Sequence, residues 1–184
     1  MPERFPALAD LAGLSLAAIA QAAADRRLPP VERWNPPHCG HSAMRIARDG
    51  SWYHEGALIP RPAMVRLFAS ILRREPDGGY VLVTPAEKLA IDVEDAPFVA
   101  VEMTSEGEGP ARRLAFLLNT GNAVVAGPSH PLRIEHGQPY LAVRDRLDAL
   151  VARPVFYELA EIALAEAGDP LGLWSDGAFF VLDA

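Results

Sequence analysis

One cysteine, Cys39, is present among the 184 residues, so the chain cannot form an internal disulfide. Small domains in oxidising compartments commonly depend on disulfides, and the cysteine usage here gives no sign of that environment. Half of the residues are hydrophobic, and a chain of this length can bury a sizeable core. We therefore expect a cytoplasmic globular protein that is stabilised by a hydrophobic core.

Positive charge is also scarce, because 17 lysines and arginines stand against 24 aspartates and glutamates and leave a net charge of −7. Proteins that bind nucleic acids or anionic membranes broadly need a positive field, so we expect neither as a partner. The balance still allows a small anionic ligand held by a few local cations.

Long hydrophobic runs are missing too. The uncharged stretch 11–24 is shorter than the roughly 20 residues that span a bilayer. The residues before it carry a net negative charge, whereas a signal peptide begins with positive charge. Because Leu8, Leu11 and Ile19 recur at helical spacing, we predict a packed helix over residues 7–26.

Catalytic motifs with a fixed spacing are absent: there is no GxGxxG after a strand, no GxxxxGK(S/T), no GxSxG and no HExxH. The segment HCGH (38–41), together with His54, offers candidate metal ligands, yet zinc sites usually separate their ligands by two or more residues. Cys39 has no base recognisably placed to activate it. We expect no metal, no cofactor and no catalytic residues, and we interpret 38–41 as a loop at the domain junction.

Hydrophobic periodicity and turn residues predict the secondary structure. The expected elements are helices at 7–26, 61–74 and 154–167 and strands at 44–48, 51–55, 80–83, 89–94, 98–105, 112–118, 122–126, 131–136, 140–144 and 178–182. Asp49-Gly50 is a hairpin turn signal, and Pro62 suits the first turn of its helix. No series of alternating strands and helices indicates parallel βαβ units, so the fold class is α+β.

The sequence partly repeats itself. Arg61-Pro62 opens the segment RPAMVRLFASIL, and Arg153-Pro154 opens RPVFYELAEIAL, with leucines at matching positions. The flanks correspond as well: MRI (44–46) to LRI (132–134), and DGGYVLV (77–83) to DGAFFVL (176–182). We predict that 44–83 and 132–182 superpose as hairpin, helix and strand in the same order; a chance likeness between two amphipathic helices is the alternative.

These patterns predict two domains, an N-terminal α+β domain at 1–84 and a C-terminal domain at 85–184. The second domain is expected to contain a bent antiparallel sheet closed by the helix at 154–167. A duplicated chain commonly builds a pocket or cleft between its halves, so we expect any ligand at the junction of the two domains.

Arginines are the sharper functional signal, because the guanidinium group is suited to planar, paired recognition of phosphate or carboxylate. Those beside apolar strand or helix starts are Arg45, Arg61, Arg133, Arg144 and Arg153. The alternative for each is an ion pair that buttresses the fold, with a carboxylate such as Glu55, Asp95 or Glu158.

Aromatic residues and one lysine add to this signal. Trp34, Trp52, Tyr53 and Tyr140 either stack on a base or pack in the core. Lys88 ends the segment TPAEK after a predicted strand, where it either contributes to an anion site or lies in a solvated turn.

Segments spread over much of the chain resemble the bacterial domain-of-unknown-function family 1285. They are WNPPHCG (34–40), IARDGSWYHEG (46–56), IPRPAMVRLFASILRRE (59–75), GYVLVTPAEKLAI (79–91), DAPFVAV (95–101), HPLRI (130–134), PYLAVRDRL (139–147) and RPVFYEL (153–159). The resemblance implies two domains with an internal duplication, the second similar to pleckstrin-homology folds. It also implies a nucleotide-like ligand at the domain interface and a role in signalling.

We therefore expect a non-catalytic binding module with a cleft at the domain junction. Its expected ligand-binding residues are Trp34, Arg61, Lys88, Arg133, Tyr140 and Arg153. Two alternatives stay open: a protein-interaction domain without a small ligand, and an enzyme that uses Glu87, Lys88 or Cys39.

Overall fold

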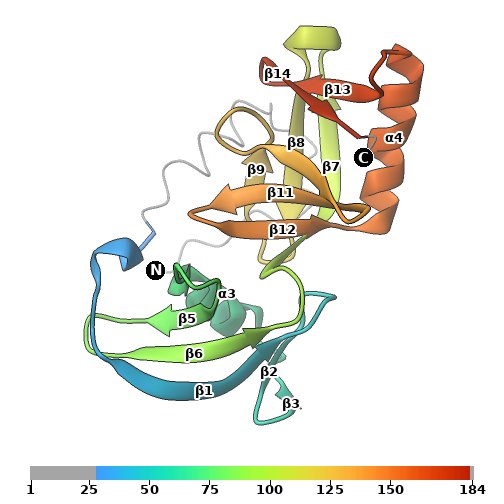
Figure 1. Ribbon diagram of the computed structural model, residues 1–184. Coiled ribbons are helices and arrows are strands. Elements are labelled where there is room, and N and C mark those ends of the chain that lie inside the picture. The colour runs from blue at the N-terminus through green and yellow to red at the C-terminus, as the bar shows by residue number, and fades with distance from the viewer. Residues whose placement is uncertain (1–27, 183–184) are drawn as a thin grey trace, which may run out of the picture.

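The structure, a computed structural model of the chain, describes residues 28–182. The helix predicted at 7–26 lies outside these residues. Two curled β-sheets form two domains, and the chain passes from one to the other after β6 (Figure 1). The fold is therefore a two-domain α+β fold made mostly of sheet, as the sequence predicts.

The N-terminal domain contains one six-stranded sheet and one helix. Its elements are η1 (Val31–Arg33), β1 (His38–Ile46), β2 (Trp52–His54), β3 (Ala57–Leu58), α3 (Pro62–Ser70), β4 (Leu72–Arg74), β5 (Tyr80–Val83) and β6 (Lys88–Val93). The strand order is β3-β2-β1-β6-β5-β4, and every pair is antiparallel except β1 with β6. Because β6 pairs with both β1 and β5, this domain extends past the boundary expected after residue 84.

The C-terminal domain contains a second six-stranded sheet, a long helix and a two-stranded ribbon. Its elements are β7 (Phe98–Glu106), η2 (Gly109–Ala111), β8 (Arg113–Leu118), β9 (Ala123–Val125), β10 (Leu132–Glu135), β11 (Gln138–Arg144), β12 (Leu147–Val151), α4 (Arg153–Glu166), β13 (Gly172–Ser175) and β14 (Ala178–Val181). The order is β10-β11-β12-β7-β8-β9, with β12 and β7 parallel. The prediction of a purely antiparallel sheet is therefore wrong at this pair.

The two sheets share one topology. In each, the first and sixth strands of the domain lie side by side and run parallel, and hairpins extend the sheet outward on both sides. The first domain is thus repeated in the second, β1–β6 corresponding to β7–β12. This supports a duplication, but the correspondence differs from the predicted one: α3 lies between the third and fourth strands, whereas α4 follows the sixth.

The helix predicted at 61–74 is shorter in the structure. It ends at Ser70, and Leu72–Arg74 forms β4, in which Leu72 is fully buried opposite Leu82. Pairing with β5 buries Leu72 as well as a helix would, and it satisfies the backbone, so tertiary context overrides the helical pattern. Two apolar residues of this helix, Met64 and Leu67, are exposed.

Most other predicted elements are confirmed, and three strands were missed besides β4. The helix predicted at 154–167 is α4, and the strands expected between 80 and 144 and at 178–182 are present. The sequence analysis did not predict β3, β12 or β13. β11 shows why alternation works as a signal, since every second residue is buried and one face lies on the core.

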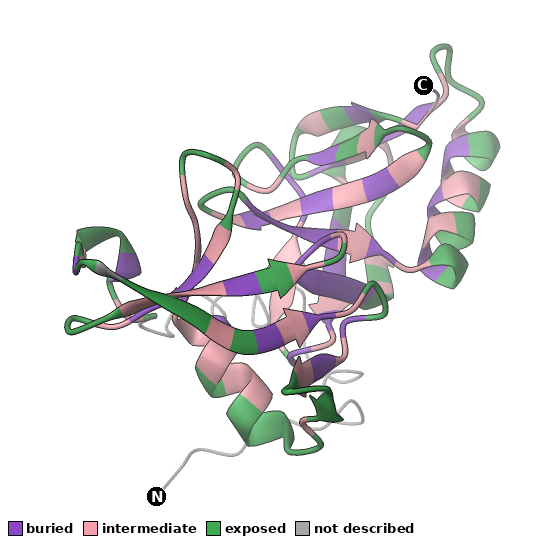
Figure 2. Cartoon of the chain, turned by 60° about the horizontal axis from the view of Figure 1, so that its bottom comes forward, coloured by how far each residue is buried: buried purple, intermediate pink, exposed green. Residues whose placement is uncertain are grey.

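A single hydrophobic core joins the two domains. It includes Ile46, Trp52 and Leu72 of the first domain together with Phe98 and Leu141 of the second. The buried residues follow the inner faces of both sheets, as the purple segments show (Figure 2). Within residues 28–182, no helix combines the length and the apolar character needed to cross a membrane.

Candidate functional site

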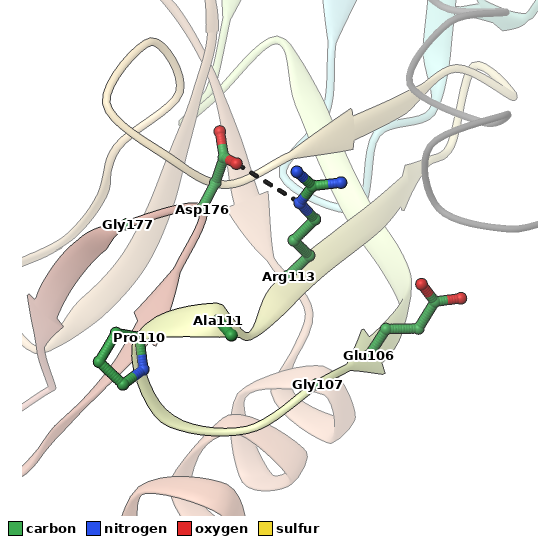
Figure 3. A pocket seen from close by; sticks show the side chains of 7 residues that line it. All are labelled: Glu106, Gly107, Pro110, Ala111, Arg113, Asp176 and Gly177. Atoms are coloured by element: carbon green, nitrogen blue, oxygen red, sulfur yellow. Dashed lines mark ion pairs between the residues drawn. The ribbon is translucent and has the colours of Figure 1, made fainter.

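Two open hollows lie at the far end of the C-terminal domain, on either side of the loop between β7 and β8. One, of about 400 Å³, is lined by Glu106, Arg113 and Asp176 among others (Figure 3). The other, of about 500 Å³, is lined by Arg112, Glu166 and Trp174 among others. None of the six residues predicted to bind a ligand lines either hollow.

Side chains from both domains cross the junction. Arg144 on β11 donates a hydrogen bond to the carbonyl of Ala69 near the end of α3. Asn119, after β8, donates to the carbonyl of Gly50 in the β1–β2 turn at 3.1 Å. These contacts hold the second sheet against α3 and against the first hairpin.

A group of charged and tyrosine side chains accompanies these contacts, and we refer to it as the junction cluster. Its members are Arg48, Arg74, Tyr80, Asp95, Arg133, Tyr140 and Asp148. The cluster draws on both sheets and on the link between β6 and β7, which places it where the domains meet.

Arg133 and Tyr140 are cross-strand neighbours in the β10–β11 hairpin. The Arg133 guanidinium lies 5.2 Å from the centre of the Tyr140 ring. It donates to both carboxylate oxygens of Asp148, at 3.0 and 2.9 Å, and to Glu135 at 3.2 Å. The hydrogen bonds that Arg133 donates to Asp148 raise the pKa of Arg133 against the opposing effect of burial. Arg133 is therefore a cation that two carboxylates hold over the ring of Tyr140.

The hydroxyl of Tyr140 donates a hydrogen bond to Asp95 at 2.7 Å. Burial and this hydrogen bond raise the pKa of Tyr140 to about 12. Asp95 also pairs with Arg48 at 3.2 Å, and the Arg48 side chain is 60% exposed. The link between the domains thus holds a carboxylate between a phenol of the second domain and an arginine of the first.

A second arginine and tyrosine pair comes from the other repeat. Arg74 and Tyr80 are cross-strand neighbours in the β4–β5 hairpin, with 5.3 Å between the guanidinium and the ring centre. Burial raises the pKa of Tyr80, with smaller electrostatic effects from Arg74, Asp148, Asp95 and Arg133. β4–β5 corresponds to β10–β11 in the duplication, so each repeat contributes an equivalent pair.

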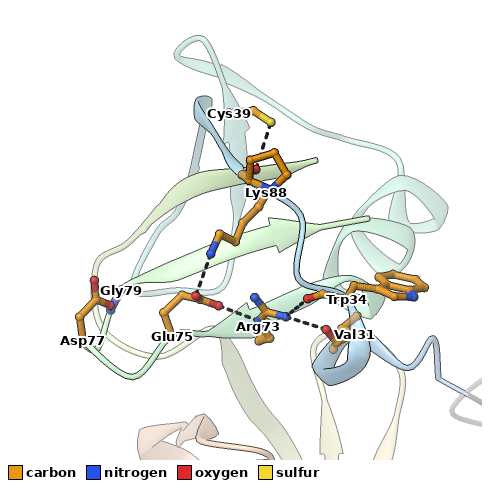
Figure 4. Close-up of polar contacts among 9 residues, drawn as sticks. Val31, Trp34, Cys39, Arg73, Glu75, Asp77, Gly79 and Lys88 are labelled. Atoms are coloured by element: carbon orange, nitrogen blue, oxygen red, sulfur yellow. Dashed lines mark hydrogen bonds and ion pairs between the residues drawn. The ribbon is translucent and has the colours of Figure 1, made fainter. Parts of the chain in front are cut away.

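Lys88 and Trp34, also predicted to bind the ligand, belong to a different group in the N-terminal domain (Figure 4). Lys88 Nζ lies 3.1 Å from Glu75, which also accepts a hydrogen bond from Arg73 at 2.6 Å. Arg73 donates to the carbonyls of Val31 and Trp34 as well. This arrangement ties η1 to β4 and β6.

Glu75 is ionised more readily than an ordinary glutamate. Burial by itself would raise its pKa, but the hydrogen bonds from Arg73 and Lys88 outweigh that effect and lower it. The Lys88 ammonium is thereby neutralised within the fold, which leaves it little charge to offer a ligand.

Arg61 and Arg153 are exposed at the starts of α3 and α4. Among residues 28–182, neither has a hydrogen bond or ion pair from its side chain. Their positions are also not equivalent, since Arg61 precedes the first helical residue and Arg153 is that residue. The structure therefore brings together Arg133 and Tyr140, and separately Trp34 and Lys88, but not all six predicted residues.

The alternative reading of the arginines as buttresses holds for several of them. Arg45 pairs with Glu94 and lies 4.4 Å from the Tyr53 ring centre. The sequence analysis did not single out Arg48, Arg74 or Tyr80. A usable signal exists in retrospect: in both RREPDGGY (73–80) and RIEHGQPY (133–140), an arginine and a tyrosine flank a glycine turn.

The residues proposed for catalysis or metal binding lie apart. The Cys39 thiol is exposed and donates to the carbonyl of Pro37 at 3.3 Å, and His41 pairs with Asp92 at 3.2 Å. These residues belong to β1, so the loop expected at 38–41 is a strand. No group of three metal-ligating side chains occurs within the part of the chain that the structure describes.

Comparisons with known proteins cover nearly all of the described chain. Residues 29–96 match the "Domain of unknown function (DUF1285), N-terminal domain", and residues 97–182 match the "Protein of unknown function (DUF1285), C-terminal domain". The two matches meet in the link between β6 and β7. Among curated proteins, none matches the chain.

Two solved structures resemble the protein. The crystal structure of a DUF1285 family protein from Silicibacter pomeroyi DSS-3 is 44% identical and has a TM-score of 0.78, and the likeness covers 89% of this chain and 93% of that one. The crystal structure of a DUF1285 family protein from Shewanella baltica OS155 is 25% identical with a TM-score of 0.54, over 65% of this chain and 91% of that one.

Proposed function

The chain belongs to the DUF1285 family, and on that basis we propose that it is a cytoplasmic, non-catalytic module that binds a small anionic, nucleotide-like ligand at its domain junction. The nucleotide-like class and a role in signal transduction follow from the family resemblance. The observation that carries the location is the junction cluster, in which each repeat contributes one arginine stacked on one tyrosine.

The arginines of the cluster divide into two roles. Arg133 uses its donors on Asp148 and Glu135, so in this proposal it orients Tyr140 and does not bind the ligand directly. Arg74 donates only to the carbonyl of Gly78, at 3.3 Å, and has no carboxylate partner within residues 28–182. Arg74, together with the largely exposed Arg48, therefore supplies the charge that binds the anion.

The tyrosines supply the aromatic part of the proposed site. Tyr80 and Tyr140 carry flat rings with polar hydroxyl groups, a combination that suits the face and the edge of a base. Both rings already stack against guanidinium groups, and a base placed beside them would extend that stacking. Trp34, Arg61, Lys88 and Arg153 take no part in the site proposed here.

We favour a binding module over an enzyme because the candidate catalytic residues are engaged or separated. Lys88 is paired with Glu75, the Cys39 thiol is bonded to a backbone carbonyl, and Glu87 is exposed in a turn. The pleckstrin-homology-like architecture implied by the resemblance stays a prediction for the C-terminal domain. A curled sheet followed directly by α4 is the feature that supports it.

The proposal is tested by a thermal-shift screen of mononucleotides, dinucleotides and inorganic phosphate, alongside mass spectrometry of small molecules that co-purify with the protein. A ligand at a hundred times its Kd should stabilise the folded chain by about 2.7 kcal/mol. Arg74→Gln should weaken binding of the best ligand by about 1.5–3 kcal/mol, the contribution of a hydrogen bond to a charged group.

Arg61→Gln is the control, because Arg61 is also an arginine of the N-terminal domain without a carboxylate partner among residues 28–182 but lies outside the junction cluster, although it is more exposed than the half-buried Arg74. Its Kd should stay within about twofold of the wild-type value, a difference below about 0.5 kcal/mol. Equal losses of affinity in Arg74→Gln and Arg61→Gln would show that the ligand does not bind at the junction cluster. If no nucleotide stabilised the protein, the proposed ligand class would be wrong.

A further inference from the structure

The β13–β14 ribbon lies at the end of the C-terminal domain, away from the N-terminal domain (Figure 1). It contacts η2 and α4 and joins neither six-stranded sheet. Its inner face is part of the core, since Leu173 and Ser175 are fully buried and Phe180 is nearly so. A rigid two-stranded element is thus fixed on the outside of the domain.

The outer face of the ribbon is aromatic and partly exposed, with Trp174 half-buried and Phe179 and Val181 exposed. Trp174 and Phe179 are cross-strand partners with ring centres 5.3 Å apart in an edge-to-face arrangement. Phe179 is 37% exposed, and Val181, farther along the same face, is 41% exposed. Contiguous exposed aromatic and aliphatic side chains are uncommon on a monomer and are enriched at the centres of interfaces.

Backbone contacts hold these side chains in place. The Ser175 hydroxyl donates to the carbonyl of Ala126 at 2.7 Å and accepts the amide of Leu114 at 2.9 Å, which anchors β13 to the domain. Gly172 lies under the Phe179 ring, because a Cβ added there would be 2.7 Å from Cζ of that ring. The aromatic face is therefore preorganised, and binding to it costs little ordering of side chains.

The hollow beside Trp174 adds negative charge to this face. Its volume is about 500 Å³, and its lining includes Glu108 and Glu166. The one cation that lines it, Arg112, donates to Glu166 at 3.1 and 2.6 Å and to Ser105 at 2.7 Å, and its side chain is only 12% exposed. Arg112 is thus committed internally, and Glu108, which is exposed, gives the hollow its net charge.

We propose that this face, formed by Trp174, Phe179, Val181, Glu108 and Glu166, docks an extended segment of a partner protein that carries apolar side chains and at least one lysine or arginine. The cation would lie over the indole of Trp174, within reach of the carboxylates. Apolar side chains on either side of it would cover Phe179 and Val181.

The backbone of the ribbon suits an extended partner. β14 pairs with β13 and with no other strand among the described residues, and β10 packs against it without pairing; in this proposal the partner segment adds as a further strand along β14. Addition of a strand to an open edge is a common mode of peptide recognition, with specificity from alternate side chains. The net charge of −7 favours the approach of a basic segment.

The test uses the full chain to select from a random dodecapeptide display library, followed by titration of the most enriched peptide in synthetic form. The enriched sequences should combine lysine or arginine with apolar residues. In nitrogen-15 correlation spectra the peptide should shift the indole N–H signal of Trp174, which is identified with a Trp174→Phe variant, and leave those of Trp34 and Trp52 in place.

Two substitutions and two matched controls decide the assignment. Trp174→Ala should weaken binding of the peptide at least tenfold. Glu108→Lys, a change at an exposed position, should weaken it at least fivefold. Tyr157→Ala and Glu102→Lys, an exposed aromatic on α4 and an exposed glutamate on β7, should leave the Kd within twofold.

Four outcomes would overturn the proposal. Three are the absence of enriched sequences, the enrichment of acidic peptides, and binding to the Trp174→Ala and Glu108→Lys variants that is as tight as binding to the wild type. A fourth is competition by lysine methyl ester at the same concentration as the peptide, because that would make the hollow a site for small cations and not a docking face. Nucleotide binding at the junction is expected to be unaffected in every variant, so this test and that of the ligand site fail separately.

Discussion

The contact between Tyr140 and Asp95 shows how much one residue contributes to the junction. The phenol of a strand in the second domain bonds a carboxylate in the link between the domains, and the same carboxylate pairs with Arg48 of the first. A hydrogen bond to a charged group is worth about 1.5–3 kcal/mol. Single side chains can therefore set both the stability of the junction and its dependence on pH.

Replacement of Tyr140 by phenylalanine should reduce the free energy of unfolding near pH 8, because Asp95 loses a donor. The pKa of Tyr140 is raised to about 12 in the folded chain, whereas an ordinary tyrosine has a pKa of 10.0. As the pH rises between these values, the unfolded chain releases the proton while the folded chain retains it, so the wild-type protein loses stability. Tyr140→Phe has no hydroxyl to titrate at this position, so its stability does not fall for this reason as the pH rises.

The stability difference between wild type and Tyr140→Phe should thus shrink as the pH rises from 8 towards 11, measured by denaturant unfolding at each pH. Tyr157→Phe is the control, since Tyr157 is exposed on α4. A difference that stays constant over this range would show that the Tyr140 hydroxyl titrates in the folded chain as an ordinary phenol does.

Thr120 makes the opposite case, a polar atom that is buried without a partner. Its side chain is 4% exposed, and its hydroxyl has no hydrogen bond in the described part of the chain. Thr120→Val keeps the shape and removes the unpaired hydroxyl, so stability should rise by about 1 kcal/mol. Thermal unfolding measures the change, with Thr104→Val at an exposed site of β7 as the control. A lower Tm in Thr120→Val would mean that the hydroxyl is satisfied.

At the scale of elements, α3 depends on a residue from the other domain. Arg144 on β11 donates to the carbonyl of Ala69, and its guanidinium lies 5.7 Å from the centre of the Phe98 ring. Burial lowers the pKa of Arg144. A cation near the last carbonyls of a helix is favourable, because these groups have no partner within the helix. The end of α3 is therefore completed by the second sheet.

Arg144→Ala should destabilise the protein by about 2–3 kcal/mol, since it removes buried packing and the charged donor to the Ala69 carbonyl, which then keeps only the backbone N–H of Ile71. Hydrogen exchange should show faster exchange in the last turn of α3. Arg146→Ala, an exposed arginine two residues on, should change stability by less than about 0.5 kcal/mol. Unchanged exchange in α3 would show that the contact does not support the helix.

At the scale of the whole molecule, the two sheets share one core, and the β1–β2 turn is pressed against the second domain. Gly50 has a φ of +86°, and a Cβ added there would lie 2.5 Å from Nδ2 of the Asn119 side chain. Because Ile46 and Trp52, on either side of this turn, pack in the same cluster as Phe98, damage to the turn should be transmitted to both domains.

Gly50→Ala should lower the unfolding temperature while calorimetry still shows a single transition whose calorimetric and van't Hoff enthalpies agree. Gly56→Ala is a close control, because Gly56 has a φ of +80° with nothing near the added Cβ. Gly56→Ala introduces backbone strain without a steric clash, so it should lower the unfolding temperature less than Gly50→Ala does. Two separate transitions would contradict the view that the domains fold as one unit.

Part of the candidate site could be read from local sequence. Arg133 and Tyr140 lie in the strands that the sequence predicts at 131–136 and 140–144, and they are cross-strand partners because a short turn places these strands opposite each other. Arg74 and Tyr80 were missed, and Asp95 was named only as a possible ion-pair partner, since these residues approach Arg133 and Asp148 only when two sheets meet. Arg61 and Lys88 were chosen from motifs whose surroundings depend on the same long-range packing.

The sequence by itself determined the hairpins, most strands and α4, because turn residues such as Asp49-Gly50 and the spacing of apolar side chains act over a few neighbouring residues. Tertiary structure alone decided three features: the parallel pairing of β1 with β6 and of β7 with β12, the conversion of 72–74 from helix to strand, and the gathering of the junction cluster. Each of these features depends on packing between segments that are distant in the sequence. Local patterns of residues do not specify which distant segments are buried against one another.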